Sequence, residues 1–92
     1  MKKRYVSIPV DFFREGKYFV AYSHPLDFSA HGKTFKEARE KFTEAVNIFF
    51  DELEKKGTME EVLLELGWQK IDKTFQPQIR ISEEEIKIPC PA

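Results

Sequence analysis

The side chains best suited to acid-base or nucleophilic chemistry in this sequence are those of His24, Asp27, His31 and Cys90. Histidine is the usual acid or base near neutral pH, so a hydrolase could use His24 with Asp27 from the same loop. However, no G-x-S-x-G motif supplies a nucleophile, and the single cysteine lies near the C-terminal end, where we expect fraying. The spacing of the two histidines matches no recognised pair of metal ligands. We therefore expect a protein that is not an enzyme and has no cofactor or metal.

The segment Gly32-Lys33-Thr34 matches the last three residues of a Walker phosphate-binding loop. The complete loop also needs a glycine five positions before Gly32, and that position holds Asp27. The nucleotide-binding interpretation therefore fails. Thr34 and Glu37 instead have the spacing of a capping box, in which the threonine oxygen accepts from the backbone N–H three residues later and the glutamate reaches back to the cap.

A long helix is predicted from Phe35 to near Lys56. Its basic end and the following Gly57 are typical of a helix C-terminus. Apolar residues recur every three or four positions, which defines a single buried stripe. This stripe comprises Phe35, Ala38, Phe42, Ala45, Val46, Phe49 and Leu53.

Two β-strands are predicted before this helix, over residues 4–13 and 17–23. The first has apolar residues at a spacing of two (Val6, Ile8, Val10 and Phe12), which is typical of a strand with one buried face. Glu15-Gly16 then forms the turn of a hairpin. This turn places Phe12 opposite Phe19 and Val10 opposite Ala21.

The same alternation places an aromatic set on the other face of the sheet. Aromatic residues on a face that the helices leave uncovered are typical of interface cores. The cover is either the C-terminal segment of the same chain, a second copy, or another protein, because small domains often complete their burial by association. The residues expected at this interface are Tyr5, Phe13, Tyr18, Val20 and Tyr22.

After the long helix, the pattern is less regular. Before the long helix, a short third strand is expected over 28–31. After it, a second capping box at Thr58 begins a short helix that Gly67 ends. A strand is expected over 68–74. The segment 76–92 is expected to be an extended C-terminal segment, although the alternating runs 79–81 and 86–88 also suggest a hairpin. The sequence therefore predicts a single α+β domain spanning 1–92, with its core in 4–75 and a small antiparallel sheet covered by helices mainly on one face.

Composition limits the classes of function. The 92 residues suffice for one domain, and 15 Lys and Arg against 16 Asp and Glu give a net charge of -1. This charge provides no broad positive field for nucleic acid. Lys2, Lys3 and Arg4 beside Tyr5 form the one candidate nucleic-acid contact, and a solubilising N-terminus is the favoured interpretation. With no apolar stretch of membrane-spanning length, we expect a cytoplasmic protein.

The residues from 4 to 53 resemble the HicB-like antitoxin family. The resemblance rests on the hairpin run Gly16 to Tyr22, a Pro25-Leu26-Asp27 loop, and Gly32-x-Thr34 followed by Glu37-Ala38 and Ala45 along the helix. That family has a glycine, any residue, a threonine and then Glu-Ala opening the long helix, after a loop with proline and leucine.

The resemblance implies three strands followed by a helix and at least one further strand. It also implies a non-catalytic partner of a HicA-type toxin, which cleaves messenger RNA and is blocked when its active surface is covered. Many members carry a C-terminal DNA-binding helical motif, but the roughly 25 residues after Gly67 contain Pro77, Pro89 and Pro91 and do not fit one. We therefore expect a stand-alone member. Because of the aromatic face of its sheet, we also expect it to be a homo-oligomer. The alternative is an RNA-binding or orphan regulatory module.

Overall fold

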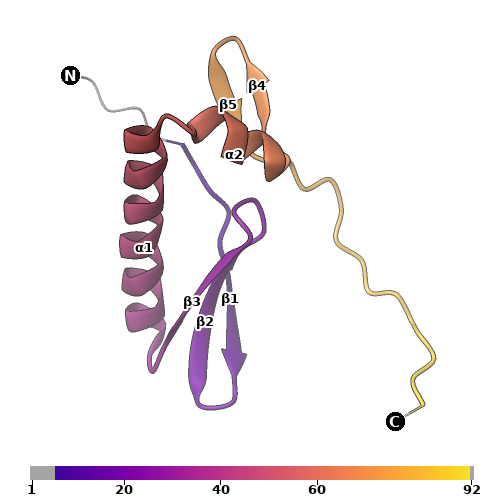
Figure 1. Cartoon of the computed structure of the whole chain (residues 1–92). Coiled ribbons are helices and arrows are strands. Elements are labelled where there is room, and N and C mark those ends of the chain that lie inside the picture. Colours follow the sequence, from indigo (N-terminus) through magenta and orange to yellow (C-terminus); the bar gives the residue numbers. More distant parts are fainter. Residues whose placement is uncertain (1–5, 92) are drawn as a thin grey trace.

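The computed structural model describes residues 6–91 and shows an α+β fold (Figure 1). Three antiparallel strands form a sheet in the order β1-β2-β3, and a long helix, a short helix and a separate two-stranded hairpin follow. The predicted fold class is confirmed. The elements are β1 (Asp11–Glu15), β2 (Tyr18–Ser23), β3 (Phe28–Gly32), α1 (Phe35–Lys56), α2 (Met59–Glu65), β4 (Gln69–Ile71) and β5 (Thr74–Gln76).

The first strand is shorter than the sequence predicts. Residues 6–10 have no regular secondary structure, and β1 begins only at Asp11. Pro9 has no N–H to donate to a ladder, which explains why pairing starts after it. The prediction that Ile8 and Val10 face the core is nevertheless correct, because both side chains pack against it.

The register of the β1–β2 hairpin differs from the predicted one by two residues. Phe12 lies opposite Ala21, and Glu15 lies opposite Tyr18, so the turn is Gly16-Lys17. Gly16 has φ 61, a left-handed conformation that glycine adopts without a steric penalty. Because side chains alternate with a period of two, a shift of two residues leaves every side chain on its predicted face.

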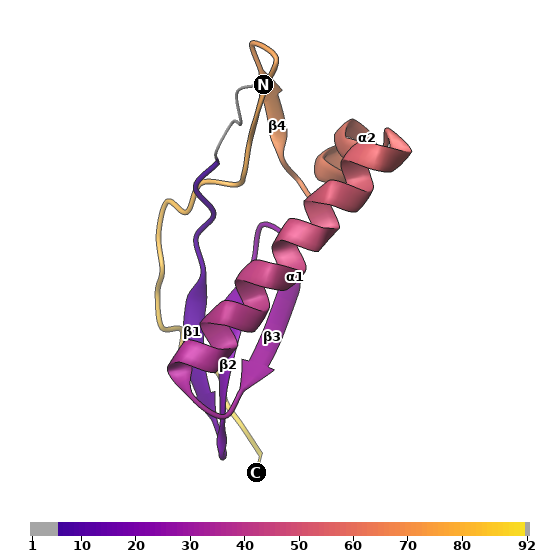
Figure 2. The same ribbon diagram turned by 90° about the vertical axis from the view of Figure 1, so that its left-hand side faces the viewer.

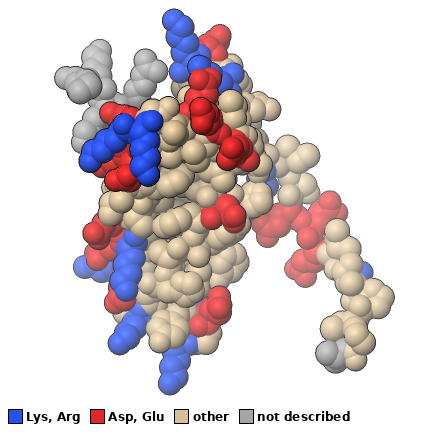
Figure 3. Space-filling view, in the orientation of Figure 1, with Lys and Arg blue, Asp and Glu red and all other residues tan. Residues whose placement is uncertain are grey.

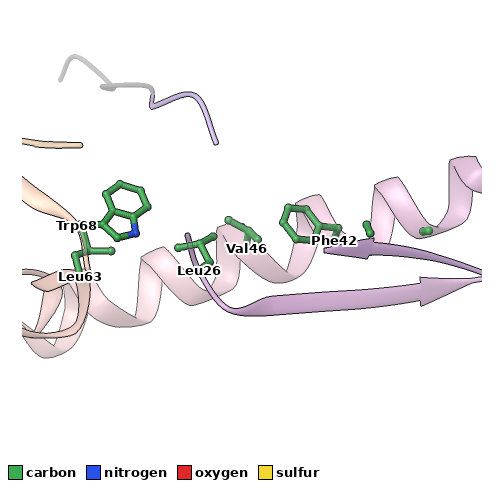
Figure 4. Close-up of a cluster of buried hydrophobic side chains, with 7 residues drawn as sticks. Leu26, Phe42, Val46, Leu63 and Trp68 are labelled. Carbon is green, nitrogen blue, oxygen red and sulfur yellow. The ribbon is translucent and has the colours of Figure 1, made fainter. Parts of the chain in front are cut away.

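The core lies between α1 and one face of the sheet (Figure 2). α1 packs against β2 and β3. Figure 4 shows how Leu26, Phe42 and Val46 continue towards Leu63 and Trp68 at the other end of the helix. The buried cluster consists of Ala21, Leu26, Ala38, Phe42, Val46, Leu63 and Trp68.

The helix α1 begins and ends close to where the sequence predicts. The Thr34 hydroxyl accepts a hydrogen bond from the Glu37 N–H at 3.0 Å, and the Glu37 carboxylate accepts from the Lys33 N–H at 3.4 Å. At the other end, Gly57 has φ 66 and donates its N–H to the Glu54 carbonyl. Thr34 is thus confirmed as the N-cap, although the carboxylate reaches the residue before the cap.

The second predicted capping box is not formed. The Thr58 side chain makes no capping hydrogen bond, although α2 does begin at Met59. Thr58 has φ -109 and ψ 11, whereas the N-cap Thr34 is extended at φ -133 and ψ 161, the conformation that an N-cap side chain needs. The Thr58 N–H donates to the Leu53 carbonyl at 3.0 Å and completes the end of α1. Since only Gly57 and Thr58 separate the two helices, the backbone of Thr58 is held by the first helix.

The end of α2 ties the C-terminal part to the sheet. Gly67, at φ 92, donates to the Leu64 carbonyl, and Trp68 donates to the Leu63 carbonyl, which is the same type of helix ending. The Trp68 indole is 3% exposed and donates from Nε1 to the Pro25 carbonyl at 2.8 Å. This bond joins the loop after β2 to the end of the second helix.

The expected single strand over 68–74 is instead a hairpin, β4–β5. Its turn residues, Asp72 and Lys73, have φ 49 and 67, so the chain reverses where a continuous strand was predicted. Residues 77–91 have no regular secondary structure and run away as an extended segment, which we call the tail (Figure 1). Within residues 6–91, no helix is long and apolar enough to cross a membrane.

The two threonines provide a test of helix capping. Replacing Thr34 with alanine should lower the free energy of unfolding by about 0.5–2 kcal/mol, because the Glu37 N–H loses its acceptor. Thr58→Ala is the matched control and should change it little, since its hydroxyl caps nothing. Urea denaturation followed by Trp68 fluorescence measures both, and equal losses would contradict the assignment of the caps.

The contact between β3 and α1 depends on the absence of a side chain at Gly32. A Cβ there would lie within 2.9 Å of backbone atoms of Glu37 and Ala38, which cannot move independently of the helix. Gly32→Ala should therefore cost about 3 kcal/mol or more. Gly16→Ala meets nothing within 4 Å and should cost only the left-handed strain of about 1–2 kcal/mol. A smaller loss at Gly32 than at Gly16 in the same urea experiment would refute this close packing.

Candidate protein-interaction surface

The face of the sheet opposite α1 carries Phe13, Tyr18, Val20 and Tyr22, and we call it the open face. Phe12 and Ala21 pair across β1 and β2 on the face towards the helix. Their neighbours Phe13 and Val20, which also pair with each other, therefore lie on the opposite face. The structure thus brings together four of the five predicted interface residues.

The exposure of these residues is uneven. Phe13 is 52% and Tyr18 is 49% exposed, whereas Tyr22 is half-buried and Val20 is only 6% exposed. Val20 lies on the central strand, with Phe13 on one side and His31 on the other. Val20 therefore offers little contact area, and the accessible apolar surface belongs mainly to the two aromatic residues near the hairpin turn.

Four of the predicted residues lie outside the described part of the chain. These are Tyr5, assigned to the interface, and Lys2, Lys3 and Arg4, assigned to a nucleic-acid contact.

The tail starts beside the open face. Arg80 forms an ion pair with Asp11 of β1 at 3.1 Å, and its guanidinium also contacts Glu83 at 2.9 Å. Figures 1 and 2 together place the tail on the side of the sheet away from α1. Its apolar side chains do not pack on the sheet, since the isoleucines are 73–95% exposed. They are Ile79, Ile81, Ile86 and Ile88.

The open face carries two carboxylates, Asp11 and Glu15, which lie opposite Tyr22 and Tyr18. Figure 3 shows basic and acidic side chains along α1 and a group of acidic side chains on the tail. At the start of α1, the hydrogen bond from Lys41 and then that from the Lys33 N–H hold the pKa of Glu37 below its ordinary value. This carboxylate belongs to the helix cap, so it serves the fold.

The residues considered for catalysis are dispersed. His24 and His31 are both exposed, at the end of β2 and within β3 respectively. Asp27 has φ 48 and its N–H donates to the His24 carbonyl, so the pair forms a backbone turn. Cys90 is exposed in the tail. Within residues 6–91, no group of three or more His, Cys, Asp or Glu side chains is arranged to hold a metal ion.

A second surface feature was not predicted from the sequence. α1 covers β2 and β3, so a groove remains between the helix and the chain leading into β1. Phe12 lines this groove, and its ring centroid lies 4.5 Å from that of Phe35 at the start of α1. Val6, Ile8 and Val10 line one wall, and Arg39, Thr43 and Asn47 line the other. The signal in the sequence was the apolar alternation of 6–12, because it predicts an apolar side for this segment, and α1 packs mainly on β2 and β3.

Comparison with protein-family models found no match, and searches of curated proteins and of solved structures found none either.

The uneven exposure leads to different expectations for two neighbours on the open face. Val20→Ala should lower the free energy of unfolding by roughly 1–3 kcal/mol, because two buried methyl groups are removed. Tyr18→Thr, which keeps a β-forming residue at a half-exposed position, should change it by no more than about 0.5 kcal/mol. Urea denaturation at the lowest workable protein concentration limits any contribution from association. A loss at Tyr18 as large as that at Val20 would show that the exposed ring already supports the single-chain fold.

Proposed function

We propose that this protein is a non-enzymatic, HicB-like antitoxin of the cytoplasm. In this proposal it self-associates and blocks a small HicA-type, mRNA-cleaving toxin by covering the toxin's active surface. The sequence resemblance suggests the family and the class of partner. Binding by occlusion requires a suitable surface on this chain and does not require a catalytic group.

The observation that carries the proposal is the open face. A three-stranded sheet packed on a helix through one face normally has a polar second face. Here that face also carries aromatic side chains, with Phe13 and Tyr18 about half exposed. They lie beside the polar residues Asp11, Glu15, Ser29 and His31. Aromatic side chains provide large contact areas at low entropic cost and are enriched in the cores of interfaces. A protein partner is the type of ligand that exposed aromatic side chains with polar neighbours suit best.

The geometry also supports a role without chemistry. His24 and Asp27 are joined through a backbone turn, and His31 lies on the open face beside Val20. Occlusion needs only a folded platform, and the capped α1 and the buried Trp68 provide one.

The test combines association with inhibition. In sedimentation experiments the wild-type chain should be an oligomer, and the double variant Phe13→Ser/Tyr18→Ser should be a folded monomer. The variant should also fail to protect mRNA from a purified HicA-type toxin. Both effects are expected because a hydroxyl replaces each exposed ring at the centre of the contact.

A matched control removes exposed apolar surface elsewhere. Ile48→Ser/Leu64→Ser changes side chains that are 56% and 48% exposed on the two helices. This variant should associate and inhibit like the wild type. If instead the control and the open-face variant lose inhibition equally, or the open-face variant inhibits fully, the proposed contact surface is wrong.

A further inference from the structure

The tail and the open face both carry exposed apolar side chains, and Arg80 of the tail contacts Asp11 on the same side of the sheet. The four isoleucines of the tail are 73–95% exposed, and Phe13 and Tyr18 are about half exposed. The tail nevertheless lies on the same side of the sheet as the open face (Figures 1 and 2).

The isoleucines are spaced to form an apolar edge. Ile79 and Ile81 flank Arg80, and Ile86 and Ile88 flank Lys87. In an extended chain, residues two apart point the same way and the residue between them points the opposite way. Each run therefore presents two isoleucines on one side and a basic side chain on the other.

The ion pair of Arg80 shows how the first run is oriented relative to its own sheet. Its guanidinium contacts Asp11 of its own β1 at 3.1 Å. By alternation, Ile79 and Ile81 then point away from that sheet, in agreement with their exposures of 80% and 95%. While this ion pair holds, Ile79 and Ile81 do not cover the open face of their own chain, which leaves that face free for another copy.

We infer that the tail is an exchange arm that packs its isoleucines on the open face of a second copy of this chain. Each copy has one arm and one open face, so two copies can satisfy each other reciprocally about a two-fold axis. The run Ile86-Lys87-Ile88 covers Phe13 and Tyr18 of the other copy and leaves Lys87 in solvent. The acidic Glu83–Glu85 stretch spans the distance between the two isoleucine runs.

This inference rests on the self-association in the proposed function and specifies the segment that makes the contact. A toxin that uses the open face then has to displace the arm.

The single cysteine allows a direct test, because Cys90 is exposed two residues after Ile88. One sample of the full chain carries a nitroxide label on Cys90 and no isotope. It is mixed with a ¹⁵N-labelled full chain in which Cys90 is replaced by serine. The measurement is the intensity of the amide NMR signals of the ¹⁵N chain. We expect the signals of Phe13, Tyr18 and Val20 to be weaker than in the same mixture after the nitroxide is reduced.

The controls isolate the isoleucines. With Ile86→Ser/Ile88→Ser in the nitroxide-labelled chain, the intensities should recover, and the fold should persist because both side chains are at least 73% exposed. With Ile48→Ser in the same chain, the loss of intensity should remain. Loss that persists in the arm variant would show that the isoleucines do not make the contact.

The other outcomes separate the arm from the proposed function. Intensity loss that appears only when label and isotope are in one chain would show that the tail covers its own sheet, and would overturn the inference. If sedimentation shows an oligomer but the amide signals of the open face keep their intensity, the exchange arm is wrong and self-association is still supported. A monomer at every concentration would overturn both, while protection of mRNA from the toxin would still test the antitoxin role.

Discussion

The close approach of β3 to α1 is the constraint on which the arrangement of this molecule depends. At Gly32 the end of the strand has no side chain, and Ala38, which is fully buried, meets it from the helix. Because both residues are small, the long helix lies directly over β2 and β3. Its position determines which face of the sheet becomes the core, and it leaves the opposite face without a layer of its own.

Local signals predicted the parts of the fold that depend on neighbouring residues. The cap at Thr34, the stripe of α1 and its end at Gly57 each follow from interactions within a few residues, and the structure confirms them. The faces of the hairpin were also predictable, since alternation survives an error of two residues in register. The register itself was not, because either Glu15-Gly16 or Gly16-Lys17 gives a two-residue turn and only the pairing along the strands distinguishes them.

Features that depend on distant contacts could not be predicted in the same way. The Thr58 box has a valid sequence, but the end of the preceding helix holds the Thr58 backbone out of the extended conformation that an N-cap needs. The alternation assigns Val20 to the open face, yet its burial comes from its central position between β1 and β3. The tail contacts β1 through the pair Arg80–Asp11, whose partners are 69 residues apart.

The composition of the tail fits a segment that orders on a specific partner and avoids indiscriminate association. A long run of exposed isoleucines would act as an edge for uncontrolled strand pairing. Here the two apolar runs are short, Glu83–Glu85 separates them, and Pro77, Pro89 and Pro91 flank them. Proline restricts the free chain, so less conformational entropy is lost when the segment docks, and it also removes N–H donors that strand pairing needs. The isoleucines can then bind through their side chains to an apolar face, while the charges and prolines oppose growth into a larger sheet.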